Sequence, residues 1–169
     1  MNPIRILSLF TIPLAGMASA ATVNTTLFTI EVPDQWQVQD DKTSTILVTG
    51  SKISGGMPSP FLSIQYCVTS ASLKSPGQSQ CDRTCSEEAQ SLTSNDKLNG
   101  AEFSPIKKSE KEKDVTEYSV ELQAPAPISA LMALSCSGSG QVHVGLVSDE
   151  PKEVTKQLFE KILKSLRWK

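Results

Sequence analysis

The sequence has a single histidine, His143, and this scarcity narrows the chemistry that the chain can support. A Ser/His/Asp or Cys/His nucleophile system would have to use this one imidazole, and a histidine-based metal site would have one such ligand. There is no Gly-x-Ser-x-Gly elbow, and neither Gly55-Gly56 nor Gly138-x-Gly140 leads into the Lys-Ser/Thr of a phosphate loop. No cofactor motif is present. These absences predict that the chain is not an enzyme and takes no cofactor or metal.

Carboxylate chemistry is the remaining enzymatic alternative, because two well-placed acids suffice for glycoside hydrolysis. The chain has 18 Asp and Glu residues, and nearly all of them fall in predicted turns or on predicted solvent faces. Glu117 and Glu121 alternate with apolar residues on a predicted strand, so they are expected to share one face. Pairs of exposed strand glutamates are common without catalysis. A small hydrolase that uses such carboxylates is therefore an alternative hypothesis.

Positive charge and long apolar runs are also scarce. The chain has 16 Lys and Arg against 18 Asp and Glu, and no basic patch stands out, so no nucleic-acid partner is expected.

One apolar run, from Ile6 to Gly16, follows Arg5 and precedes the small residues Ala18-Ser19-Ala20. This order predicts a signal peptide at residues 1–20, cleaved after Ala20. No second run is long enough to span a bilayer, and Ala21 is not the cysteine of a bacterial lipid anchor, so no stable membrane anchor is expected.

Removal of the leader would leave residues 21–169 as a single domain, large enough to bury its own core. The formal net charge of the full chain is −2, and the loss of Arg5 makes it −3. The style of the signal is bacterial. It predicts export to the periplasm, with secretion to the medium as the alternative.

The chain has four cysteines, Cys67, Cys81, Cys85 and Cys136, and all of them follow the predicted leader. An even number of cysteines in an exported chain predicts two disulfides. Two pairings stay open: Cys67–Cys81 with Cys85–Cys136, and Cys81–Cys85 with Cys67–Cys136. Only Cys81-x3-Cys85 has the short spacing of a zinc site, and Cys67 and Cys136 have no close partner in sequence. Structural disulfides are therefore favoured over zinc coordination.

Alternation of apolar and polar residues predicts strands, and period-3.6 patterns predict two helices. A capping box formed by Thr84 and Glu87 opens the first helix, over residues 85–95. The second helix begins at Asp149-Glu150-Pro151. The predicted strands cover residues 27–32, 36–38, 45–49, 61–68, 101–109, 115–123, 128–136 and 141–148. Loops are predicted at 50–60 and 70–80, with a charged turn at 110–114. This order predicts an α+β fold, an antiparallel sheet with helices packed on it.

Both ends of the domain carry motifs of a known family. The segment from Phe28 to Trp36 resembles the "strand, Val-Pro, turn, Trp" opening of the Mog1/PsbP-like fold, which includes DcrB-like bacterial envelope proteins. The segment from Ile162 to Trp168 resembles that family's closing helix and its short Trp-containing strand. The resemblance implies an α/β/α sandwich, here stabilised by disulfides. It also implies an adaptor or binding module, since such domains are generally not enzymes.

Apolar residues in two predicted loop segments, residues 52–61 and 124–132, predict a partner-binding surface. Met and aromatic side chains among Gly and Pro suit an interaction surface on a rigid scaffold. The expected contact residues are Ile53, Met57, Phe61, Ile128, Leu131 and Met132, and the second segment also contains Pro125 and Pro127.

The function predicted from these features is a non-enzymatic periplasmic protein-binding module. Its most specific form is an immunity protein that neutralises a cognate secreted toxin, so the expected partner is a toxin effector. A DcrB-like envelope maintenance or assembly factor is the first alternative, and the carboxylate hydrolase is the second.

Overall fold

A computed structural model describes residues 20–41, 44–54, 56–72, 78–94, 102–112, 114–123 and 128–169. The predicted signal peptide therefore lies outside the described residues, apart from Ala20. The first half of the chain forms β1 (Ala20–Asn24), β2 (Phe28–Pro33), β3 (Gln37–Asp40), β4 (Thr45–Ser54), β5 (Met57–Val68), a 3-10 turn η1 (Ser70–Ser72) and α1 (Cys85–Ser94). The second half forms β6 (Glu102–Phe103), β7 (Lys107–Glu112), β8 (Val115–Gln123), β9 (Ser129–Ser137), β10 (Gly140–Ser148), α2 (Lys152–Ser165) and β11 (Arg167–Trp168).

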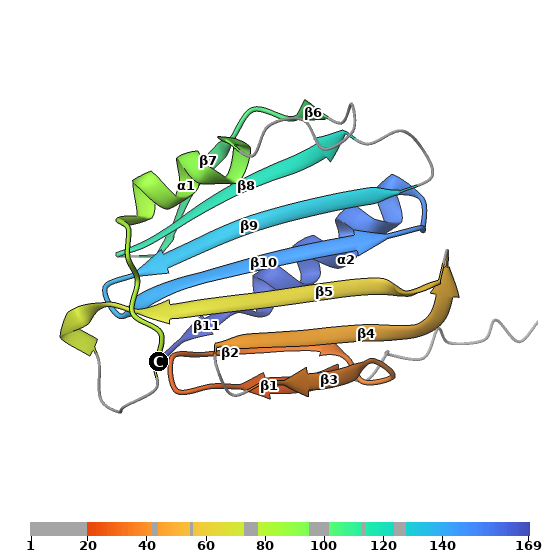
Figure 1. Cartoon of the computed structure of the whole chain (residues 1–169), viewed down its shortest axis with the longest axis horizontal. Helices are drawn as coiled ribbons and strands as arrows, with labels where there is room; N and C mark the ends of the chain where they lie inside the picture. Colours follow the sequence, from red (N-terminus) through yellow and green to blue (C-terminus); the bar gives the residue numbers. More distant parts are fainter. Residues whose placement is uncertain are drawn as a thin grey trace, which may run out of the picture.

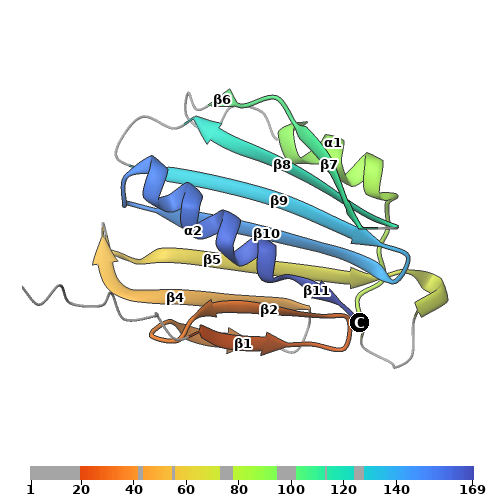
Figure 2. The ribbon, with the colours of Figure 1, turned by 180° about the vertical axis from the view of Figure 1, so that it is seen from behind.

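The strands form two antiparallel sheets. The larger sheet has the order β3-β4-β5-β10-β9-β8-β6, with β7 also paired to β8, and the smaller sheet has the order β1-β2-β11. Helix α2 and the small sheet cover one face of the large sheet, and α1 lies on the other face (Figures 1 and 2). The predicted α+β architecture, with helices packed on an antiparallel sheet, is confirmed. Neither helix among the described residues is long and apolar enough to cross a membrane.

The main core fills the space between the large sheet, α2 and the small sheet. Alternation on each strand places one set of apolar side chains on this side, such as Leu62, Ile64 and Val68 of β5. The buried residues that face it include Ile46, Val48, Leu62, Ile64, Val142, Val144, Leu146, Phe28, Ile30, Phe159 and Ile162.

Strand β9 carries apolar side chains on both faces, as its nearly continuous apolar sequence indicates. Its Leu131 and Ala133 belong to the main core, whereas Leu134 and Cys136 belong to a second cluster with Ala89 of α1. The protein therefore has a large core on the α2 side and a small one under α1.

Helix α1 begins as the capping box predicts. The Glu87 amide donates to Thr84 Oγ1 at 3.3 Å, and the Thr84 amide donates to Glu87 Oε2 at 2.8 Å. The Thr84 hydroxyl also donates to Glu87 Oε2, at 2.7 Å. The two bonds that Thr84 donates to the carboxylate, chiefly the backbone one, hold the pKa of the Glu87 carboxyl below its usual value.

The predicted loop over residues 50–60 is wrong, because strands β4 and β5 continue through most of it as a long hairpin. The register runs on after an irregularity between Thr49 and Lys52, with Ile53 opposite Pro58. A Cβ at Gly50 would lie 2.6 Å from the Ser59 carbonyl oxygen, so only glycine allows the two backbones to approach this closely. The two prolines, Pro58 and Pro60, are tolerated because β10 pairs with β5 only as far as Phe61.

The predicted strand over residues 101–109 and the charged turn after it are corrected as well. The chain forms two short strands, β6 and β7, and the charged sequence from Lys107 to Glu112 is itself a strand paired with β8. The reversal occurs next to Asp114, whose φ of 69° lies in the left-handed region that Asp tolerates better than most residues. Charged side chains suit this strand because it lies at the sheet edge.

Candidate functional site

One face of the large sheet is apolar over much of its width, and of the described helices α1 packs on it, at one end. Cross-strand register places Leu47, Ser63, Gly145, Met132 and Val120 in one row from β4 to β8. A neighbouring row contains Thr49, Phe61, Val147, Ala130 and Leu122. Neither row contains a charged residue. We call the accessible part of these rows, Leu47, Phe61, Met132 and Val147, the open sheet face.

The open sheet face is continuous across strands β5, β10 and β9. Phe61 pairs directly with Val147, whose exposed fraction is 38%, and Leu47, Phe61 and Met132 are half-buried. Met132 Cγ lies 3.9 Å from the position that a Cβ of Gly145 would occupy, so the Met132 side chain lies next to this glycine. Figure 1 shows the face toward the viewer, with α1 at its upper left and α2 behind the sheet.

The structure brings two of the predicted contact residues together on this face, Phe61 and Met132. Ile53 and Ile128 are exposed, at 67% and 50%, and lie toward the end of the sheet where the β4–β5 hairpin and the start of β9 are found. Met57 is in β5, and its side chain is outside the described part of the chain; Pro125 and Pro127 also lie outside it.

Leu131 has to be corrected as a contact residue. Its side chain is 8% exposed and packs in the main core on the α2 side of the sheet. Because alternate strand residues point to opposite faces, Leu131 and Met132 cannot both reach one surface. The sequence analysis missed Leu47 and Val147. The available signal was alternation: Val147 lies on the strand face opposite Val144 and Leu146, and Leu47 lies opposite Ile46 and Val48.

Two disulfides hold α1 and the segment before it against the covered end of this face. Cys67 is bonded to Cys81, and Cys85 is bonded to Cys136, which is the first of the two predicted pairings. Gln141 is buried and its Nε2 donates to the Arg83 carbonyl oxygen at 2.8 Å. Covalent and polar links therefore fix segment 81–85 to strands β5, β9 and β10.

His143 lies in a polar cleft of about 570 Å³ beside this clamp. Its Nε2 is 3.5 Å from Glu88 Oε1 of α1, and Glu88 also pairs with Arg83 at 3.5 Å. Burial lowers the pKa of the His143 imidazole, and the Glu88 carboxylate opposes this shift without reversing it. The other polar groups that line the cleft include Gln65, Ser79, Gln80, Asp82 and Gln141. The neutral imidazole is thus a polar contact between β10 and α1.

Stability is expected to fall as the pH drops below about 6.5, the ordinary pKa of histidine. The folded protein favours neutral His143, so the unfolded chain takes up this proton first and proton uptake favours unfolding. The loss grows until the pH passes the lowered pKa of the folded state. Urea unfolding of His143→Gln from about pH 8 to about pH 5 should show a shallower decline than the parent protein. Equal slopes for the two proteins would contradict this role.

The two glutamates of the hydrolase hypothesis share one face of β8 as predicted, but they are separated along the strand. Four residues of strand span about 13 Å, whereas paired carboxylates of glycosidases lie about 5 to 9.5 Å apart. Glu121 pairs with Lys152 at the start of α2. Glu117 lies further along, so the two acids do not form a catalytic pair.

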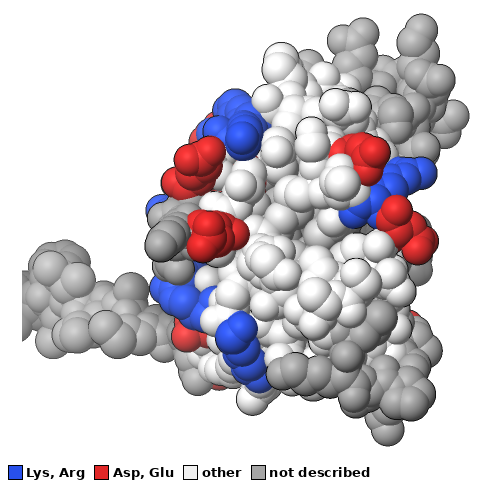
Figure 3. All heavy atoms as spheres, turned by 90° about the vertical axis from the view of Figure 1, so that its left-hand side faces the viewer, with Lys and Arg blue, Asp and Glu red and all other residues white. Residues whose placement is uncertain are grey.

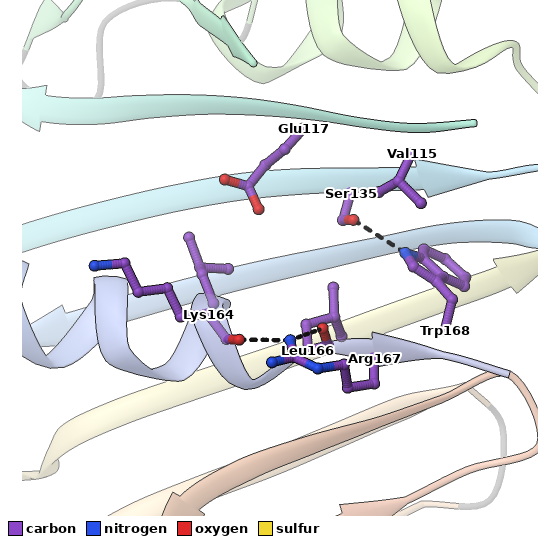
Figure 4. A pocket seen from close by; sticks show the side chains of 8 residues that line it. Val115, Glu117, Ser135, Lys164, Leu166, Arg167 and Trp168 are labelled. Atoms are coloured by element: carbon purple, nitrogen blue, oxygen red, sulfur yellow. Dashed lines mark hydrogen bonds between the residues drawn. The ribbon is translucent and has the colours of Figure 1, made fainter. Parts of the chain in front are cut away.

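Glu117 lines a small pocket of about 250 Å³ between β8 and the end of the chain (Figure 4). Its side chain is 8% exposed, and Trp168 and Ser135 form another wall, with Trp168 Nε1 donating to Ser135 Oγ at 3.3 Å. The Arg167 guanidinium donates to the carbonyl oxygens of Lys164 and Leu166 at 2.6 and 2.9 Å. The bond from Trp168 to Ser135 attaches the end of the chain to β9, whereas the Arg167 bonds stay within the end of α2 and the residue after it.

Figure 3 faces the end of the sheet that carries η1 and the β9–β10 turn, and acidic and basic residues gather on its two sides with a broad uncharged surface between them. Within the described residues, no group of three or more His, Cys, Asp or Glu side chains is placed to hold a metal ion.

These observations define the fold as Mog1/PsbP-like, in agreement with the resemblance of the two ends of the domain. The chain is similar to the solution structure of cyanobacterial PsbP (CyanoP) from Synechocystis sp. PCC 6803, with a TM-score of 0.63 and 15% sequence identity. The match covers 95% of this chain and 99% of the cyanobacterial one, and at this identity it shows the fold alone. No family model and no curated protein matches the sequence.

Proposed function

We propose that this protein is a non-enzymatic protein-binding module that engages its partner through the open sheet face. The observation that carries this proposal is the uncharged pair of rows across β4, β5, β10 and β9, with Phe61 and Val147 side by side at its centre. Contiguous accessible apolar surface favours association, because burial of such surface is the main favourable term in binding. The sheet backbone beneath it is rigid, which lowers the entropic cost of binding.

The setting of this module is an oxidising compartment outside the cytoplasm. Two disulfides support this location, since they persist in exported proteins and are rare in the cytosol. Together with the predicted signal peptide, they support the periplasm. In its most specific form, the proposal is that the partner is a secreted toxin and that this protein is its inhibitor. The features in favour are predicted export, small size and mild acidity.

Affinity capture from a periplasmic extract, followed by mass spectrometry, tests the proposal. The wild-type protein is used as bait beside two variants, Val147→Asp and Val154→Asp. Val154 is the matched control: it is also an exposed valine, at 50%, but it lies on α2 behind the sheet. A toxin recovered in stoichiometric amount by the wild type and the control would support inhibition. Recovery of an envelope assembly component would support the DcrB-like alternative instead.

Val147→Asp is expected to weaken binding of the captured partner about tenfold or more, because an aspartate at the centre of the contact would be desolvated without a counter-charge. Titration calorimetry with the purified partner measures this change. Thermal unfolding should shift little, since Val147 is already 38% exposed. Equal affinities for Val147→Asp and wild type would place the binding surface elsewhere.

A further inference from the structure

The edge strands of the two sheets differ in how they resist pairing with another chain. Native proteins blunt edge strands with charges, prolines, bulges or short length. Here β7 has the sequence Lys-Lys-Ser-Glu-Lys-Glu, β3 has four residues and ends in Asp40, and β6 and β11 have two residues each. Strand β1 is the exception. It has five residues, Ala-Ala-Thr-Val-Asn, with no charge, proline or register irregularity.

Among the described residues, the outer side of β1 has no strand partner. The inner side pairs with β2, in an unbroken register from Ala20 opposite Pro33 to Asn24 opposite Thr29. Within the part of the chain that the structure describes, no other backbone group bonds to β1. Both ribbon views place β1 at the lower margin of the molecule (Figures 1 and 2). The strand therefore presents one row of backbone donors and acceptors outward.

We infer that two copies of this protein associate by antiparallel pairing of their β1 edges, which joins the two small sheets into one continuous sheet. Side-chain alternation restricts the register, because Val23 faces the core while Thr22 is exposed. A slip of one residue would reverse the faces, so the two-fold axis has to pass through a residue. An axis through Thr22 sets Ala20 opposite Asn24 and Ala21 opposite Val23. If Ala20 is removed with the predicted leader, the pairs from Ala21 to Val23 remain.

A second copy fits this edge because the strand is self-complementary in charge and size. From Ala20 to Leu27 the chain has no charged side chain, and the α-ammonium that cleavage would leave on Ala21 lies opposite Val23, so antiparallel self-pairing sets no like charges directly opposite each other. The axis sets Thr22 opposite Thr22, and cross-strand threonine pairs are favourable. The ladder has five residues in each strand, or three after cleavage behind Ala20, and is a small interface, so the dimer is weak and depends on protein concentration.

Sedimentation equilibrium over a range of concentrations tests this inference with the exported protein. Thr22→Lys places two ammonium groups opposite each other and should raise the dimer dissociation constant roughly fivefold. Gln39→Lys is the matched control, since Gln39 is an exposed residue on the other short edge strand, β3. It should leave the dissociation constant unchanged. A mixture of Thr22→Lys and Thr22→Glu should recover dimer formation, which separates loss of pairing from loss of folding.

Amide hydrogen exchange provides a second measurement, with β1 expected to gain protection as the wild-type concentration rises. A wild-type protein that stays monomeric at millimolar concentration would overturn the inference. So would a dimer that tolerates Thr22→Lys, or one that Gln39→Lys weakens to the same extent. Failure of the mixed charge variants to associate would overturn it as well. These results do not depend on the open sheet face, which lies on the other sheet.

Discussion

Replacing Cys85 and Cys136 together with alanine is expected to lower the free energy of unfolding by about 4 kcal/mol, a large share of the stability of a single domain. The disulfide joins residues 51 positions apart, and its main effect in the chain-entropy account is to restrict the unfolded chain. The loop closed by Cys67 and Cys81 does not overlap it, so the two effects should add.

The Cys67–Cys81 pair supplies the matched control. Its sequence separation is 14, for which the same account gives about 3 kcal/mol. Urea unfolding of the two double-alanine variants should therefore rank them, with the Cys85/Cys136 variant less stable. The reverse order would show that folded-state contacts of the bonds outweigh loop closure.

Loss of the Cys85–Cys136 bond should also act locally, on α1. This helix has ten residues, which is too short to be stable alone in water. Without the bond it keeps the packing of Ala89 and Leu92 near Leu134 and the contact of Glu88 with His143. Amide exchange in α1 should accelerate more than exchange in α2, whose buried face is larger. Equal acceleration in both helices would mean that the bond stabilises the protein only globally.

The elements with strong local signals could be predicted from the sequence. The Thr84–Glu87 pair marked the start of α1, and alternation marked which residues of β5 and β10 share the core face. Both of these signals are set within a few residues, so no knowledge of the tertiary structure is needed. The cysteine pairing is different: the sequence left two pairings open, and the structure shows one of them.

The elements that were missed depend on neighbours distant in sequence. Gly55, Pro58 and Pro60 have loop composition, and only the end of β10 at the level of Phe61 shows why a strand can contain these prolines. Likewise, alternation shows that Tyr118 and Val120 share a face of β8, but it does not show that this face lies on the α1 side. For Leu131 and Met132, alternation alone separates the two side chains, but it does not show which of them faces the core.

Truncation of Phe28 to alanine is expected to cost about 4 kcal/mol of unfolding free energy, because the side chain is fully buried and its removal leaves a cavity. Phe28 belongs to the opening motif of the domain, and Trp168 belongs to the closing one. The ring centroids of Phe28 and Trp168 are 6.4 Å apart, and those of Phe28 and Tyr66 of β5 are 5.5 Å apart. Both pairs are arranged edge to face. Such pairs contribute beyond the area they bury. Phe28 thus links the small sheet, the large sheet and the end of the chain.

Chemical denaturation of Phe28→Ala, with Val38→Ala as the control, measures this effect. Val38 is an apolar strand residue with an exposed fraction of 44%, so its truncation should change stability by about 0.5 kcal/mol or less. Near-ultraviolet circular dichroism should also weaken in Phe28→Ala, because Tyr66 and Trp168 lose the ring that orders them. A loss below about 1 kcal/mol would show that the surrounding side chains collapse into the space. In that case, the two ends of the domain would be held by the β2–β11 pairing and by the bond from Trp168 to Ser135 rather than by the aromatic cluster.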